Sequence, residues 1–167
     1  MEAKELITKS LEQSQGALTR SLDGLSQEEV AWCPGLECNS IAFTLWHTAR
    51  VEDMFMNRMI QGQPEIYTSE SWQEKLGTPD KAARYTVEEL QAWPVPDMAV
   101  LREYSDAVRK NTLSLLEAMP VEKLSQAANP ERPMGTVGDM LGRMSTEIAM
   151  HVGQIAYLRG MQRGLDK

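Results

Sequence analysis

The sequence predicts an all-α protein, a helical bundle that forms a single domain over residues 1–167. Four long stretches place apolar residues three and four positions apart, which is the period of an amphipathic α-helix. Residues that favour helix ends, such as Ser, Thr, Asp and Gly, stand at the borders of these stretches. A chain of 167 residues also suits one domain with a sizeable core.

Residues 4–23 are predicted to form the first helix, which ends at Gly24. The residues at helical spacing on its inner face are Ile7, Leu11, Ser14, Leu18 and Leu22. Ser26 and Glu29 then have the spacing of a capping box, so a short turn of helix is expected there. Pro34 breaks the helical pattern and predicts a loop.

The second helix, residues 40–61, is apolar nearly all round. It is expected to begin at Asn39 or Ser40 and to end at Gly62. Its apolar residues are Ile41, Phe43, Leu45, Trp46, Ala49, Val51, Met54, Phe55, Met56, Met59 and Ile60. A helix with this profile is expected in the middle of a bundle.

The third helix is predicted over residues 98–118, with Asp97 at its start and Pro120 after its end. The stripe expected to face the core is Leu101, Tyr104, Val108, Thr112, Leu115 and Met119. Its charged residues are expected to form a solvated face, which comprises Arg102, Glu103, Asp106, Arg109 and Lys110. On the second helix, Arg50 and Asn57 are likewise expected on the more polar side.

The fourth helix, residues 137–161, begins at Thr136 and carries both apolar and ionisable residues on one stripe. The apolar members are Val137, Leu141, Met144, Ile148, Ile155 and Leu158. Glu147 and His151 fall inside the same stripe at 100° per residue. The carboxylate of Glu147 is therefore expected to point at the core, where it needs a positive partner, a raised pKa or a metal ion.

Two connections link these helices. Residues 61–97 are long and rich in Pro and Gly, with short helices expected at 70–75 and 86–92, and residues 120–135 are expected to be a loop. The aromatic residues of the long connection are Tyr67, Trp72, Tyr85 and Trp93. They are expected either to wall a pocket or to cover one end of the bundle.

The composition argues against several classes of protein. The net charge of −7 and the absence of a basic run disfavour nucleic acid or an anionic membrane as a partner. No apolar run reaches the ~18 residues needed to span a bilayer, and the N-terminus lacks the apolar core of a signal peptide, so a cytoplasmic location is expected. Cys33 and Cys38 have no second pair and no nearby His, and are expected to be structural thiols rather than zinc ligands or a loop disulfide, with a reactive thiol as the less favoured alternative.

The two histidines of the chain both lie within the long apolar helices. Glu147 and His151 have the i, i+4 spacing by which one helix presents two ligands to a cation. Together with His47 they would make a two-His, one-carboxylate site of the kind that suits Zn, Ni or non-haem Fe(II). The alternative is a metal-free bundle, in which Glu147 pairs with Arg143 and the imidazoles form ordinary hydrogen bonds.

Two segments of the sequence also resemble a known family. They are Asn39-Ser40-Ile41 through Leu45-Trp46-His47-Thr48-Ala49-Arg50-Val51-Glu52-Asp53, and Glu147-x-x-x-His151-Val152-Gly153-Gln154-Ile155 with Tyr157-Leu158-Arg159-Gly160. This pattern resembles the DinB/YfiT-like metalloenzyme family over essentially the whole chain. The resemblance implies a four-helix bundle with a divalent metal near one end, held by His47, Glu147 and His151. Many members of the family have a histidine where this chain has Glu147.

The resemblance also implies an activity. Family members with an assigned function are thiol-dependent S-transferases that join a low-molecular-weight thiol, such as bacillithiol, mycothiol or glutathione, to a small electrophile. The expected cofactors are thus a divalent metal (Zn, Ni or Fe) and a low-molecular-weight thiol as co-substrate, and a homodimer that acts in stress response or detoxification is expected.

Two other functions remain open at this stage. One is a non-catalytic stress-response binding protein with a structural metal or polar triad, and the other is a metal-dependent hydrolase. No catalytic base is assigned from the sequence, and the side chains that are available are Glu52, Asp53, Arg143 and Tyr157.

Overall fold

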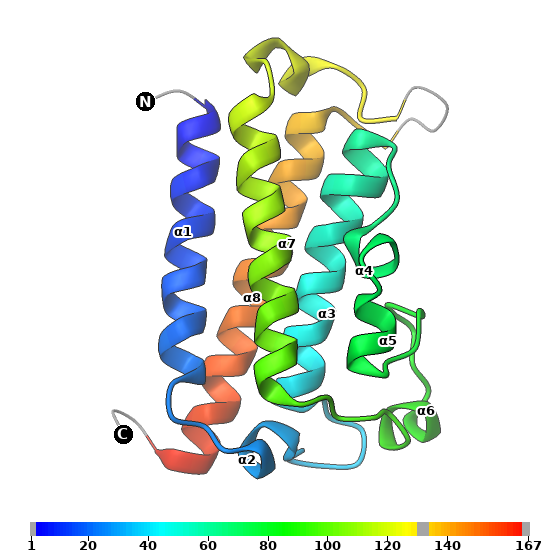
Figure 1. Cartoon of the computed structure of the whole chain (residues 1–167). Helices are drawn as coiled ribbons and strands as arrows, with labels where there is room; N and C mark the ends of the chain where they lie inside the picture. Colours follow the sequence, from blue (N-terminus) through cyan, green and yellow to red (C-terminus); the bar gives the residue numbers. More distant parts are fainter. Residues whose placement is uncertain (1–2, 130–133, 165–167) are drawn as a thin grey trace.

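Four long helices run side by side along the length of the molecule (Figure 1). They are α1 (Ala3–Leu22), α3 (Ile41–Asp53), α7 (Met98–Ala118) and α8 (Val137–Arg163). The computed structural model describes residues 3–129 and 134–164. The all-α bundle is confirmed, because the described residues contain no β-pairing beyond one isolated bridge, between Ala127 and Thr136.

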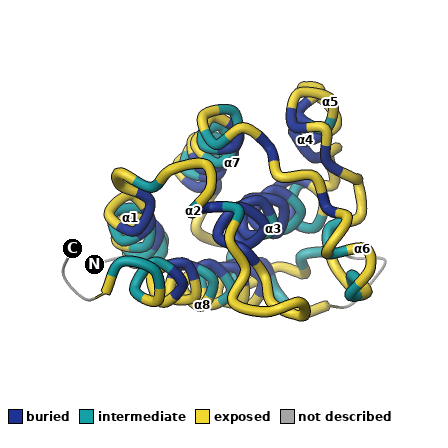
Figure 2. The backbone as a smooth tube through the Cα atoms, turned by 90° about the horizontal axis from the view of Figure 1, so that it is seen from below, coloured by how far each residue is buried: buried dark blue, intermediate teal, exposed yellow. Residues whose placement is uncertain are grey.

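Helix α3 occupies the centre of the bundle. It packs against both α7 and α8, while α8 also packs along α1. The end-on view in Figure 2 shows α3 enclosed by α7, α8 and the shorter helices. Every residue of α3 except His47 is buried, as its nearly continuous apolar sequence predicts.

The starts of the helices follow the predicted capping chemistry. The hydroxyl of Ser40 accepts a hydrogen bond from the Phe43 N–H at the start of α3. The Asp97 carboxylate likewise accepts hydrogen bonds from backbone N–H groups in the first turn of α7. Thr136 and Asp139 form a complete capping box at the start of α8. The predicted box at Ser26 is also present and begins the short helix α2 (Gln27–Ala31).

The predicted second helix is divided into two parts. After α3 the chain continues as η1 (Met54–Gln61), which has the wider turn of a π-helix and ends at Gly62 with a φ of 66°. The carboxylate of Asp53 lies at the junction and is fully buried. It accepts hydrogen bonds from the Ile66 and Tyr67 backbone N–H groups and from the Tyr104 hydroxyl. These bonds attach the long connection to the bundle.

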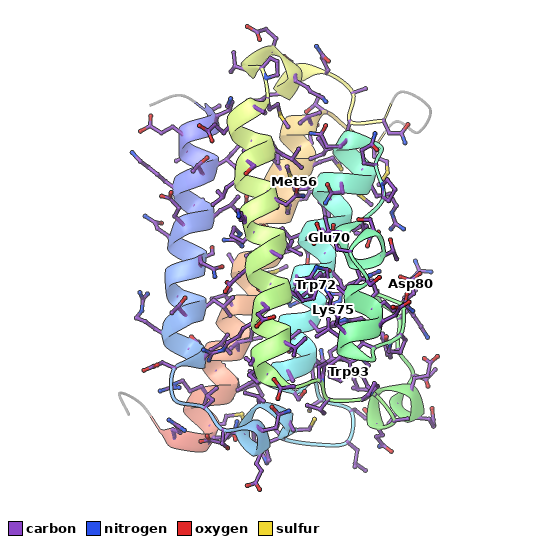
Figure 3. The ribbon with its side chains drawn as sticks, in the orientation of Figure 1. Met56, Glu70, Trp72, Lys75, Asp80 and Trp93 are labelled. Carbon is purple, nitrogen blue, oxygen red and sulfur yellow. The ribbon has the colours of Figure 1, made fainter. Side chains whose placement is uncertain are left out.

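The long connection contains three short helices. They are α4 (Ile66–Ser69), α5 (Trp72–Leu76) and α6 (Val87–Gln91), so two lie near the predicted positions and α4 was not predicted. Trp72 and Trp93, labelled in Figure 3, are buried against the bundle. The predicted loop 120–135 begins with a 3₁₀ turn, η2 (Val121–Ser125), and its residues 130–133 lie outside the described part.

The predicted solvated face of α7 is wrong at one residue. Arg109 is only 7% exposed, and its Nε and Nη2 donate to the two carboxylate oxygens of Glu52, each at 2.8 Å. Arg50 and Asn57, predicted on a polar side, are also buried. Because the long connection folds back over α3, Arg50 instead donates to Asp80, which is labelled in Figure 3, and also pairs with Glu65.

We predict that Arg109→Ala will lower the free energy of unfolding by about 3–5 kcal/mol, because it leaves the Glu52 carboxylate buried without its counter-charge. Urea denaturation would measure the change. The double replacement Glu52→Gln/Arg109→Met removes both charges and should recover most of the loss. As a matched control, Lys9→Ala breaks an exposed ion pair with Glu5 and should change stability by about 0.5 kcal/mol or less. A loss for Arg109→Ala no larger than that of the control would contradict the prediction.

Candidate functional site

The two histidines meet where α3 packs against α8. The ring centroids of His47 and His151 are 4.9 Å apart, and the ring planes are nearly perpendicular, at 83°. Both side chains line a cavity of about 440 Å³, together with Gln154 from α8 and with Arg84 and Tyr85 from the long connection. The structure therefore brings together the two imidazoles that the sequence singled out from distant helices.

Hydrogen bonds at Nδ1 fix the orientation of both rings. The Nδ1 atom of His47 is 2.7 Å from the Ala82 carbonyl oxygen, and the Nδ1 atom of His151 is 2.9 Å from Oε1 of Gln154. Because both partners are acceptors, each Nδ1 carries the hydrogen and donates it. In the neutral ring the lone pair is then on Nε2. The Nε2 of His151 is buried and has no hydrogen-bond partner among the described residues.

Burial keeps His47 in this neutral form. Desolvation lowers the pKa of His47 below its usual value of 6.5, and the hydrogen bond to Ala82 opposes this effect. The neighbouring His151 lowers the pKa further, while the Glu147 carboxylate raises it. A neutral imidazole with a free Nε2 lone pair is the form in which histidine binds a metal ion.

Glu147 lies at the edge of the apolar stripe, so the prediction that it points at the core is wrong. Its side chain is 43% exposed, and its Oε2 atom lies 3.7 Å from Nε2 of His151. The buried face of α8 passes beside it, through Met144, Ile148 and Val152. The alternative ion pair with Arg143 is absent from the described part of the chain, where Glu147 approaches His151 instead.

His47, His151 and Glu147 offer imidazole nitrogens and a carboxylate oxygen, which are donor types that bind divalent metals. Two donors bound to one tetrahedral ion at about 2.0–2.1 Å lie roughly 3.3 Å apart, and two imidazoles on such an ion have centroids roughly 5 Å apart. The observed 3.7 Å and 4.9 Å are close to these values. However, no three His, Cys, Asp or Glu side chains in residues 3–129 and 134–164 form a complete metal site as they stand. The metal ligands His47, Glu147 and His151 therefore stay a prediction.

The four other polar side chains considered from the sequence do not take part in this site. Glu52 bonds to Arg109, and Asp53 holds the long connection. Arg143 is exposed, and Tyr157 is 70% exposed and lines a different cavity. None of the four lines the cavity of the two histidines.

Two groups at the site were not found from the sequence. Gln154 stands three residues after His151, so helical spacing alone places both on one face and would have identified it. The Ala82 carbonyl is a backbone group of an irregular segment, and no side-chain pattern in the sequence indicates it.

Two further cavities adjoin the histidine cavity. One, of about 380 Å³, shares Phe43 and Leu90 with it and is also lined by Cys33, Cys38 and Trp93. The other, of about 500 Å³, lies along α8. It shares Asn39 and Gln154 with the histidine cavity.

We predict that His47 will titrate below pH 6.5 in chelator-treated protein, as a ring protonated on Nδ1 in its neutral form. Nitrogen-15 NMR of the imidazoles would show both the midpoint and the tautomer. Because the unfolded chain takes up a proton at a higher pH than the folded site does, the free energy of unfolding should also fall as the pH drops from 6.5 toward the folded pKa. A midpoint at or above 6.5 would contradict the burial argument.

Within the described residues, no helix is long and apolar enough to cross a membrane.

Comparison with known proteins agrees with the fold. A crystal structure titled as a conserved protein of a locus from Enterococcus faecalis superposes with a TM-score of 0.85 at 24% identity, and the similarity covers 96% of this chain and 97% of that one. No curated protein matches the chain. The family model described as the DinB superfamily matches residues 10–155. The chain therefore belongs to the DinB superfamily.

Proposed function

We propose that this protein is a divalent-metal-dependent enzyme that transfers a low-molecular-weight thiol to a small electrophile. One observation carries the proposal. Two imidazoles from separate helices face one cavity, with each Nδ1 hydrogen-bonded to an acceptor. Histidines that bind metal ions almost always donate the other ring N–H in this way.

His47, His151 and Glu147 would hold the metal. Imidazole nitrogens with one carboxylate suit Zn, Ni or Fe. The carboxylate adds one negative charge, which partly offsets the charge of the dication. When bound, such a metal lowers the pKa of a coordinating thiol and so supplies a thiolate at neutral pH.

The surrounding residues orient the ligands and shape the substrate site. Ala82 and Gln154 fix the two imidazole rings through their Nδ1 atoms. The cavity of about 440 Å³ is within the size range of small-molecule sites. Phe43 and Tyr85 provide apolar walls, and Arg84 and Glu37 provide charge of both signs. These residues are the candidates that select the thiol and the electrophile.

A non-catalytic role is the second candidate. It is favoured by the lack of a complete three-ligand group among the described side chains. The polar cluster would then stabilise the bundle, alone or with a metal, while another surface binds a partner.

We predict that protein purified without chelator contains about one divalent metal ion per chain, measured by inductively coupled plasma mass spectrometry. His47→Ala and His151→Ala should each abolish stoichiometric metal. Gln154→Ala keeps all three ligands and should weaken metal binding about 10–100-fold, because it frees the His151 ring. Thr146→Ala, an exposed change next to Glu147, should leave the metal content unchanged. An unchanged content in His47→Ala would refute the assigned ligands.

We predict that the metal-loaded protein consumes thiol when it is offered glutathione, bacillithiol or mycothiol with a chromogenic alkylating electrophile. The rate should vanish with chelator and return with added metal, and His47→Ala should lower kcat/KM at least about 100-fold while Thr146→Ala leaves it unchanged. The non-catalytic role predicts no turnover of any pair, together with a melting temperature that falls on chelation. Release of an acid or alcohol from an ester without thiol would indicate a hydrolase instead.

A further inference from the structure

Two cysteines lie on the loop between α2 and α3, beside the histidine cavity. Cys33 and Cys38 are both exposed, and neither is in a disulfide. Both line the same cavity of about 380 Å³, whose other walls include Phe43 and Trp93. The two thiols therefore share one solvent-accessible space, which a soluble reagent can enter.

The loop backbone turns the second thiol back over residue 35. The Cys38 N–H donates to the Gly35 carbonyl at 3.1 Å, which closes a tight turn over residues 35–38. The Sγ atom of Cys38 lies 3.5 Å from the position that a Cβ atom on Gly35 would occupy. It thus lies over residue 35, two positions from Cys33.

Cys33 is held only weakly in its present position. Its Sγ atom lies 3.8 Å from the Ala31 carbonyl oxygen, a long and weak thiol hydrogen bond. Partial desolvation raises the pKa of the Cys33 thiol although the residue is exposed, and the nearby Cys38 raises it further. Cys38 lines two cavities whereas Cys33 lines one, so Cys38 is the more accessible thiol and is expected to react first.

We propose that Cys33 and Cys38 form a redox-active dithiol, which a low-molecular-weight disulfide oxidises to an intramolecular disulfide. The Cys38 thiolate attacks one sulfur of the reagent, forms a mixed disulfide and releases the first thiolate. Cys33 then loses its proton to solvent. Its thiolate attacks the Cys38 sulfur of the mixed disulfide and releases the second thiolate of the reagent. The two protein thiols are oxidised, and one disulfide is reduced to two thiols.

The position of this pair links it to the cavities of the candidate site. Cys38 lines the cavity along α8 as well, and the next residue, Asn39, lines the histidine cavity. Ser40 then caps α3, the helix that carries His47. A bond between residues 33 and 38 would fix the loop that borders all three cavities. The chemistry does not depend on a metal, so the proposal stands apart from the proposed transferase activity.

The test is intact-protein mass spectrometry after incubation of the whole chain with oxidised glutathione and then alkylation. The wild-type mass should fall by two hydrogen atoms with no alkylation and no lasting adduct. Cys33→Ser and Cys38→Ser each lack one partner. Cys33→Ser should therefore accumulate one glutathione adduct, and Cys38→Ser should react more slowly. The double variant Cys33→Ser/Cys38→Ser should be unchanged. Dithiothreitol should restore the wild-type mass.

Three results would overturn the proposal. The first is two stable glutathione adducts on the wild type, and the second is a disulfide-linked dimer. The third is a wild-type protein whose two thiols stay free under conditions in which the single variants react. Both side chains are exposed, so the serine variants should fold, and a thermal melt monitored by circular dichroism checks this. Because the readout is mass, a failure of the metal or transferase predictions leaves this result interpretable.

Discussion

Burial of α3 on every side is the constraint on which the rest of the structure depends. A polar group inside a protein needs a partner, so each charged residue of this helix determines what must pack against it. Glu52 is met by Arg109 of α7, and Asp53 by backbone N–H groups at the start of α4. Arg50 is met by Asp80, on the segment between α5 and α6. These bonds join three parts of the chain to one central helix.

The same constraint explains the candidate site. His47 is the one residue of α3 that is only partly buried, and it faces a cavity bounded by α8 and the long connection. Its Nδ1 is already satisfied by Ala82, so the ring presents only its other nitrogen to the cavity. His151 lines that cavity from α8, and Glu147, one turn earlier on the same helix, lies 3.7 Å from the His151 Nε2 atom. The pocket thus receives its donors from both rigid helices, and its walls from the connection.

The sequence was sufficient for the long helices, because apolar period and capping residues are local signals. The meeting of His47 and His151 was expected for another reason, because both stand in apolar helices of one bundle and both match the family resemblance. The sequence was insufficient where contacts between distant segments decide. Arg109 is predicted to lie on the surface, because no local pattern indicates that Glu52 of another helix lies opposite it. Glu147 is predicted to point at the core, because an angle of 100° per residue is too coarse to separate the centre of an apolar stripe from its edge. The short helix α4 depends on the Asp53 carboxylate, which no pattern within residues 66–69 reveals.

The contact between Ala82 and His47 uses a main-chain oxygen, and this has a consequence for how such proteins diverge. A carbonyl is supplied by any amino acid, so the identity of residue 82 can change while the imidazole keeps its orientation. Thr86 caps α6 and has to be kept, but the neighbouring positions 83–85 and 87, whose side chains line the same cavity, are then open to substitution without loss of that support. Randomising those positions while keeping the length of the segment offers a route to new substrate preferences on an unchanged pair of imidazoles.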